Sequence, residues 1–137
     1  MSIYRRNILH IGHHPGVKGT LTPEENLHWY FQIYPCHPCD FREVLSWVGL
    51  RGYEDVPCHT LSAGQLRRVA LARLYLSTAQ LWILDEPFTS IDVDGVADLE
   101  ALMERHLDQG GSILLTSHQQ PRLKNLGVLE LEAYVPE

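Results

Sequence analysis

Residues 81–86 read Leu-Trp-Ile-Leu-Asp-Glu, four apolar residues followed directly by two carboxylates. An unbroken apolar run of this length predicts a strand covered on both faces, as in a parallel sheet. Asp85 and Glu86 would then lie at the carboxyl edge of the sheet, where α/β proteins bind their ligands. Two carboxylates there suit phosphoryl transfer, with Asp85 organising Mg²⁺ and Glu86 activating water. A solvated strand end is the simpler alternative.

Further strands and helices around this run indicate an α/β fold with a parallel core sheet. Apolar strand patterns occur at residues 7–12, 113–116 and 128–131. A helix with apolar residues at helical spacing is expected over about residues 95–109 and is ended by Gly110. The strand at residues 113–116 is followed by a serine and His118, so two strands joined by a helix both end in polar, reactive side chains. That arrangement is typical of nucleotide sites.

Three helices are expected ahead of the central strand. Thr22 is a helix N-cap, followed by a proline and a capping-box glutamate. Asp40 opens a second helix that ends near Gly49, and the two helices form a small helical subregion. Ser62 caps a third helix that runs to about Ser77. Because this helix is apolar almost all round, we expect it to be buried.

Residues 61–65, Leu-Ser-Ala-Gly-Gln, form a turn that opens directly into the third helix. The first turn of a helix has unpaired N–H groups and the positive end of the helix dipole, so it attracts anions. Ser62 adds a hydroxyl group, and Gly64 lets an oxygen atom approach the backbone. The turn therefore predicts an anion site, with an ordinary N-cap as an equal alternative.

The order of these motifs along the chain resembles that of ABC ATPases. The serine-glycine turn comes first, the strand at residues 81–86 follows, Ser90-Ile91-Asp92 comes next, and a strand ending at His118 closes the series. The resemblance implies that ATP and Mg²⁺ are the cofactors, that Glu86 and His118 are catalytic, and that Asp85 binds the metal. The residues that would contact the nucleotide are, by the same resemblance, Ser62, Gly64, Gln65, Asp85, Asp92 and His14. Such domains act as head-to-tail dimers, so half of each site comes from a second ATP-binding subunit.

Within that family, the chain resembles the ATP-binding subunit of bacterial haem exporters of cytochrome c maturation. The likeness is carried by the alanine in residues 61–65, by the Pro-Phe-Thr-Ser sequence at residues 87–90, and by residues 11–18 and 25–30. It implies a peripheral subunit at the cytoplasmic face of the bacterial inner membrane, with integral membrane subunits as partners. The function it implies is to energise haem export or handling for cytochrome c biogenesis.

The same resemblance divides residues 1–137 into three parts of one partial domain. Residues 1–20 would hold a core strand and the Q-loop region, residues 21–60 the helical subdomain, and residues 61–137 the signature helix and the second half of the core. The expected fold class is α/β: a partial P-loop NTPase, the ABC nucleotide-binding domain, that lacks the N-terminal strands and the Walker A loop.

Two departures from the family pattern bear on activity. A Gly-x-x-x-x-Gly-Lys loop, which cradles phosphates, is not found, because in residues 12–20 Lys18 does not follow the second glycine. The strand before such a loop lies centrally, so we expect two inner strands without a neighbour and a truncated or frameshifted product. The second departure is His14, which stands where the family has glutamine. Whether the lone chain hydrolyses ATP therefore stays open.

Composition excludes several other functions. The formal charge is -6, with 17 acidic against 11 basic side chains in 137 residues, so the field of the molecule repels nucleic acid. No apolar run is long enough to span a bilayer and no export signal is found, so we expect a soluble, cytoplasmic chain of one domain. Arg67, Arg68 and Arg73 are expected on a helix surface as structural ion-pair residues.

Two alternative functions stay open. Cys36 and Cys39 have the spacing of a redox pair or of half a zinc site, although the second pair that a zinc site needs is missing and Cys58 stands alone. A metal assay on the purified protein would test this thiol or metal module. Alternatively, the chain only docks membrane subunits and has lost catalysis. Co-purification with a membrane partner in the absence of ATPase activity would favour that function.

Overall fold

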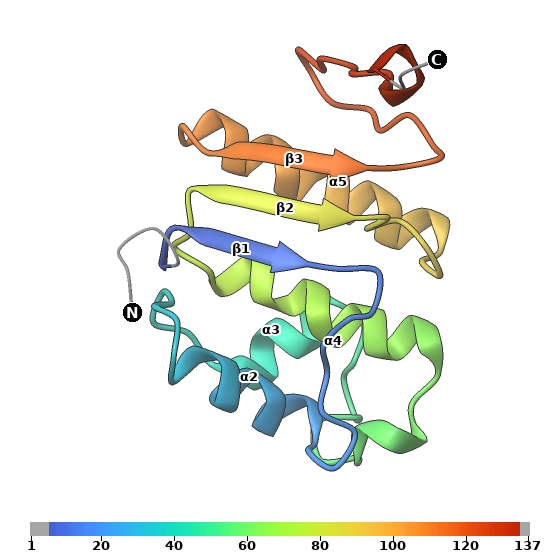
Figure 1. The fold of residues 1–137 in the computed structure, drawn as a ribbon. Coiled ribbons are helices and arrows are strands. Elements are labelled where there is room, and N and C mark those ends of the chain that lie inside the picture. Colours follow the sequence, from blue (N-terminus) through green and yellow to red (C-terminus); the bar gives the residue numbers. More distant parts are fainter. Residues whose placement is uncertain (1–5, 135–137) are drawn as a thin grey trace.

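Three parallel strands form one sheet in the computed structural model, which describes residues 6–134. The strands are β1 (Ile8–Ile11), β2 (Leu81–Asp85) and β3 (Ser112–Thr116), in the spatial order β1-β2-β3. Leu9 pairs with Trp82 across the first interface, and Asp85 pairs with Thr116 across the second. All three strands therefore end at the same edge (Figure 1), which confirms the predicted α/β class and the parallel core sheet.

One face of the sheet is buried, and the prediction that β2 is covered on both faces is wrong for the described residues. Along β2, Trp82 and Leu84 are buried, whereas the alternate residues Leu81 and Ile83 are half-buried. A continuous apolar run identifies a strand, but it does not reveal how many layers cover that strand. The buried face meets two helices, α4 (Ala63–Leu76) and α5 (Val93–Asp108), whose apolar residues form one cluster with the strands.

The outer strand β3 is exposed on alternate residues, and the side chain of Leu114 is 62% exposed. We expected two strands that each lack a neighbour; β2 is paired on both sides, whereas β1 and β3 are each paired on one side only. Within residues 6–134, no strand pairs with the outer edge of β3. Unpaired N–H and C=O groups along such an edge are free to bond to another chain.

Helix α4 lies between the sheet and the remaining helices, α2 (Pro23–Phe31) and α3 (Phe41–Trp47), as Figure 1 shows. One side of α4 contributes Ala70 and Leu74 to the cluster on the sheet, and another side contributes Val69, Ala72 and Leu76 to a second cluster with α2 and α3. Burial on both sides confirms the expectation from its apolar composition. Among the described helices, none is long and apolar enough to cross a membrane.

Two arginines of α4 are buried, which corrects the prediction that they lie on a helix surface. Arg67 is 4% exposed and Arg73 is 5% exposed, whereas Arg68 is half-buried. The guanidinium group of Arg73 donates to the carbonyl oxygen of Gly16 at 3.1 Å and lies 4.6 Å from the centroid of the Tyr30 ring. A guanidinium group can be buried where backbone carbonyl groups and an aromatic face replace water.

The tail also differs from its prediction. Residues 128–131 form no strand, and a short 3-10 helix, η2 (Leu131–Tyr134), stands at the end of the described chain. Val128 is 71% exposed and Leu129 is 66% exposed, so this apolar run has no partner surface in the described residues. A run of four residues cannot hold a strand conformation without a neighbouring strand to supply its hydrogen bonds.

Helix starts agree closely with the sequence. Thr22 and Ser62 each form a capping box, in which the cap side chain and the third helical residue bond to each other's backbone N–H groups. Asp40 caps α3 as expected. Asp92 caps α5, whose first residue is therefore Val93, two positions before the predicted start.

Replacing Ser62 with alanine should lower the free energy of unfolding by about 1 kcal/mol, since the Gln65 N–H loses its acceptor. Ser62→Asp is the matched control, because aspartate retains an oxygen in the capping position and should keep most of the stability. Urea unfolding followed by circular dichroism measures both variants. Equal losses for the two would show that an oxygen in the capping position is not what stabilises the helix.

Candidate functional site

The carboxyl edge of the sheet brings Asp85 and Glu86 next to the end of β3. The Thr116 hydroxyl group donates to Oδ1 of Asp85 at 2.6 Å, and the backbone N–H of Glu86 donates to the Thr116 carbonyl oxygen at 3.1 Å. Both residues are half-buried, so their carboxylates are open on one side. The carboxyl ends of β2 and β3 are joined because these strands are parallel neighbours whose register pairs Asp85 with Thr116.

Asp85 is held in its ionised form. The hydrogen bond from Thr116 is the largest of the effects that lower the pKa of the Asp85 carboxyl group, and partial burial opposes it. The charge and the backbone N–H of His13 and the charge of Arg67 lower the pKa further. Because the folded-state pKa is depressed, ionised Asp85 stabilises the fold above its unfolded pKa, and this contribution is lost as the pH falls through the folded pKa.

An ionised carboxylate at this edge fits Mg²⁺, which prefers oxygen ligands and uses one or two carboxylates together with water and phosphate oxygens. Within residues 6–134, no cluster of three or more acidic, histidine or cysteine side chains forms a preassembled metal cage. Asp85 is thus suited to a cation that brings the rest of its ligands with it, such as a magnesium ion bound to phosphates.

Thr116→Val should raise the pKa of Asp85 toward its ordinary value, because valine keeps the shape of threonine without the donor hydroxyl group. The carboxyl carbon resonance of Asp85, followed by NMR across a pH titration, reports this shift. Ser117→Ala removes the neighbouring hydroxyl group, which accepts from Gln119 and does not touch Asp85, and should leave the pKa unchanged. An unchanged pKa in Thr116→Val would exclude the hydroxyl group as the cause.

Glu86 and His118 meet directly. Nε2 of His118 lies 3.4 Å from Oε1 of Glu86, and the His118 backbone N–H lies 3.4 Å from the other carboxylate oxygen. The imidazole is 95% exposed and the Glu86 side chain is 20% exposed, so the carboxylate is the sheltered partner. Glu86 has a positive φ of 49°, a left-handed conformation that is costly for a residue with a Cβ atom. In this backbone conformation the Glu86 carboxylate lies beside His118.

Arg67 fixes the backbone beneath both carboxylates, and sequence reasoning did not identify it as a site residue. Its Nη2 atom donates to the carbonyl oxygens of Glu86, at 2.9 Å, and of Asp85, at 3.4 Å, while Nη1 donates to the Gly12 carbonyl oxygen at 3.0 Å. Burial lowers the pKa of Arg67, and the charges of Asp85 and Glu86 oppose that effect. The first turns of α4, the end of β1 and the end of β2 are therefore joined through one guanidinium group.

The serine-glycine turn packs against the loop that follows β2, and within the described residues no hydrogen bond or ion pair joins it to Glu86 or His118. Ser62 and Gln65 are engaged in the capping box. At Gly64, an added Cβ atom would lie 2.8 Å from the Ser90 carbonyl oxygen, so only glycine allows this approach. Asp92 caps α5 and also accepts a hydrogen bond from Arg68 at 2.8 Å.

His14 is exposed, and its ring lies edge-on to that of His13 with the ring centroids 5.4 Å apart. The preceding residue, His13, is one of the groups that lower the pKa of Asp85. Both side chains lie in the loop after β1, where no repeating geometry tells which of two adjacent histidines faces the site. The structure thus groups Asp85, Glu86 and His118 at one edge and leaves His14 and the serine-glycine turn beside it.

The cysteines give little support to a thiol module. Cys36 is half-buried, Cys39 is exposed and Cys58 is buried. Although Cys39 is exposed, the neighbouring atoms shield its sulfur partly from water, which is the largest cause that raises the pKa of the thiol, and the charge of Glu43 raises it further, so the reactive thiolate is disfavoured.

The sequence pattern of the ABC transporter family matches residues 1–89. Two similar curated relatives are both named cytochrome c biogenesis ATP-binding export protein CcmA. The protein of Saccharophagus degradans is 51% identical over 95% of this chain, and that of Escherichia coli K12 is 55% identical over 85%. The chain spans 63% and 55% of the lengths of these two relatives.

Solved structures support the fold. An ATP-binding subunit of an ABC transporter superposes with a TM-score of 0.72 at 24% identity, covering 84% of this chain and 50% of that chain. A dimeric ATP-binding cassette bound to ADP and Pi gives a TM-score of 0.71 at 21% identity, with 84% of this chain and 53% of that chain covered.

Proposed function

Because this chain belongs to the ABC transporter family, whose ATP-binding domains bind nucleotide, we propose that it forms part of the ATP-binding subunit of a bacterial haem exporter for cytochrome c biogenesis. The observation that carries the proposal is the meeting of Asp85, Glu86 and His118 at the carboxyl edge of the sheet, in a chain more than half identical to proteins named for this role.

In the proposed site, Asp85 holds Mg²⁺, Glu86 accepts a proton from the attacking water, and His118 orients Glu86. The magnesium ion would offset the negative charge on the phosphates. Glu86 is suited to its role because its carboxylate is sheltered and its only described side-chain partner is a histidine. The Glu86 carboxylate is therefore available to accept a proton from a water molecule rather than from another protein group.

The remaining site residues are proposed to act on a second nucleotide, bound by the opposite ATP-binding subunit. Ser62, Gly64 and Gln65 would face its γ-phosphate, and Asp92 would lie at the interface between the subunits. His14, by contrast, would stand at the position of the glutamine that couples Mg²⁺ to the helical subdomain of the same chain. The open N–H groups at the start of α4 and its dipole support an anion at this position.

The proposed organisation follows from these roles. Residues 1–20 hold the core strand and the Q-loop region, residues 21–60 the helical subdomain, and residues 61–137 the signature helix and the rest of the core; residues 1–5 and 135–137 lie outside the described part. A head-to-tail pair of ATP-binding subunits would sit on integral membrane subunits at the cytoplasmic face of the inner membrane. Dimeric neighbours among the solved structures support such a pair.

Disruption of the gene in its host tests the proposal. We expect periplasmic c-type cytochromes with covalently attached haem, seen by haem staining of gels, to disappear and to return when the intact gene is supplied. Normal amounts of these cytochromes in the disrupted strain would contradict the proposed function. Restoration by a gene whose product binds the membrane subunits but hydrolyses no ATP would favour a docking role alone.

A further inference from the structure

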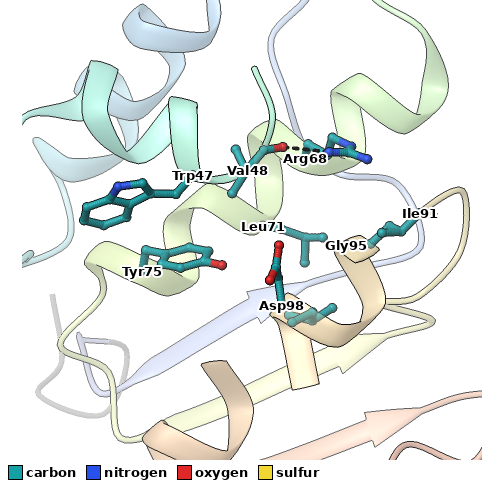
Figure 2. A pocket seen from close by; sticks show the side chains of 9 residues that line it. Trp47, Val48, Arg68, Leu71, Tyr75, Ile91, Gly95 and Asp98 are labelled. Atoms are coloured by element: carbon teal, nitrogen blue, oxygen red, sulfur yellow. Dashed lines mark hydrogen bonds between the residues drawn. The ribbon is translucent and has the colours of Figure 1, made fainter. Parts of the chain in front are cut away.

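A small pocket lies where α3, α4 and α5 meet, away from Asp85 and Glu86. Trp47, at the end of α3, forms one wall, Leu71 and Tyr75 of α4 form another, and Asp98 of α5 closes the third side (Figure 2). Its volume is about 40 Å³, enough for the end of a single side chain but not for a peptide segment. The pocket spans the seam between the helical cluster and the cluster on the sheet.

Two aromatic rings give the pocket an electronegative wall. The rings of Trp47 and Tyr75 have their centroids 5.8 Å apart and are inclined at 53°. Trp47 is 48% exposed, so its indole is open to solvent on one side, and Tyr75 is half-buried. The faces of such rings attract cations, and they attract the flat guanidinium group most effectively when it stacks on them.

Asp98 adds a carboxylate that has no ion-pair partner among the described residues. Figure 2 shows it reaching from α5 toward α4, between Leu71 and the hydroxyl end of Tyr75. After burial, the charge of Asp98 is the next cause that raises the pKa of Tyr75, while Arg105 lowers it. Arg68 also lines the pocket, but it is already bonded to Asp92 at 2.8 Å and to the Val48 carbonyl oxygen at 3.0 Å.

We propose that this pocket receives an arginine side chain from a partner protein. The aliphatic part of that side chain would pack on Leu71 and Trp47, and its guanidinium group would stack on the aromatic wall and bond to Asp98 and to the Tyr75 hydroxyl group. Charge complementarity selects the occupant, because an aromatic wall beside an unpaired carboxylate attracts cations and repels acidic groups. The inference does not rest on the proposed function, since the pocket shares no residue with the carboxylate edge.

Titration of the complete chain with N-acetylarginine amide tests the proposal, with the indole N–H resonance of Trp47 observed by two-dimensional NMR. We expect a saturable shift with a dissociation constant on the order of 1 mM, as suits one side chain in a half-open site. N-acetylcitrulline amide has the same shape without the charge and should bind at least about tenfold more weakly. Equal binding of the two probes, or no saturable shift with the arginine probe, would overturn the proposal.

Variants locate the site. Asp98→Asn should weaken binding of the arginine probe about tenfold and remove its advantage over the citrulline probe. Asp94→Asn, which changes an exposed carboxylate of the same helix that does not line the pocket, should change neither result. Both substitutions are at exposed positions, and the dispersion of the amide spectrum verifies the fold of each variant. If Asp98→Asn binds as the unaltered chain does, the carboxylate is not the recognition element and the proposal fails.

Discussion

Glu86→Gln should reduce ATP hydrolysis by the assembled ATP-binding subunits by at least about a hundredfold while ATP binding persists. Glutamine has the size of glutamate but cannot accept a proton from water, and a general base contributes about 10²–10⁴-fold to the rate. The substitution leaves the backbone of residue 86 in place, because its N–H donates to the Thr116 carbonyl oxygen and its carbonyl oxygen accepts from Arg67, and neither bond involves the side chain. Phosphate release measures hydrolysis, and retention of labelled ATP measures binding.

Glu130→Gln is the control for this experiment, because Glu130 is exposed and lies in the tail. It should hydrolyse ATP at the unaltered rate. If the Glu86→Gln variant hydrolyses ATP at the rate of the unaltered protein, Glu86 is not the general base. If the unaltered subunit binds its membrane partners but releases no phosphate, the docking function is favoured and the catalytic one fails.

Arg67→Ala should lower the free energy of unfolding by about 3 kcal/mol, a large part of the roughly 5–15 kcal/mol that holds a domain of this kind together. Arg67 itself is 4% exposed, three carbonyl oxygens of half-buried residues lose it as their donor, and an acceptor that is shielded from water and left unpaired is costly. Arg67→Lys should recover part of the loss, since one ammonium group can bond to some of the same oxygens but does not match the guanidinium geometry.

Arg68→Ala is the matched comparison, because the neighbouring arginine of the same helix is half-buried and bonds to one carbonyl oxygen and one exposed carboxylate. We expect it to cost about 1 kcal/mol. Urea unfolding measures both variants. The slope of the free energy of unfolding against urea concentration should be the same in each, so that a shifted midpoint reports a change in stability. Equal losses for Arg67→Ala and Arg68→Ala would show that burial of Arg67 adds nothing.

Local features of the fold could be predicted from sequence because their causes are local. The capping boxes at Thr22 and Ser62 depend on residues three positions apart, and the strand before Asp85 depends on four adjacent apolar side chains. The meeting of Glu86 and His118 followed from the parallel order of β2 and β3, which places successive strand ends at one edge. The roles of the remaining site residues stay predictions.

Long-range contacts could not be predicted. Arg67 bonds to Gly12, which is 55 positions away, and Arg73 bonds to Gly16, which is 57 positions away, so neither arginine looks buried in the sequence. Thr116 reads as the last residue of an apolar strand, and only the register reveals that its hydroxyl group meets Asp85. The tail at residues 128–131 was expected to be a strand because its pattern shows apolar residues, but a pattern cannot show whether a neighbouring strand exists.

The left-handed backbone at Glu86 has a consequence for laboratory evolution. Glycine would relieve about 1 kcal/mol of conformational cost at this position, while its main-chain bonds to Thr116 and Arg67 would survive. Rounds of selection for heat resistance alone would therefore enrich glycine there and discard the carboxylate. A robust but inert product would be the outcome, and activity must be scored in parallel for the glutamate to be retained.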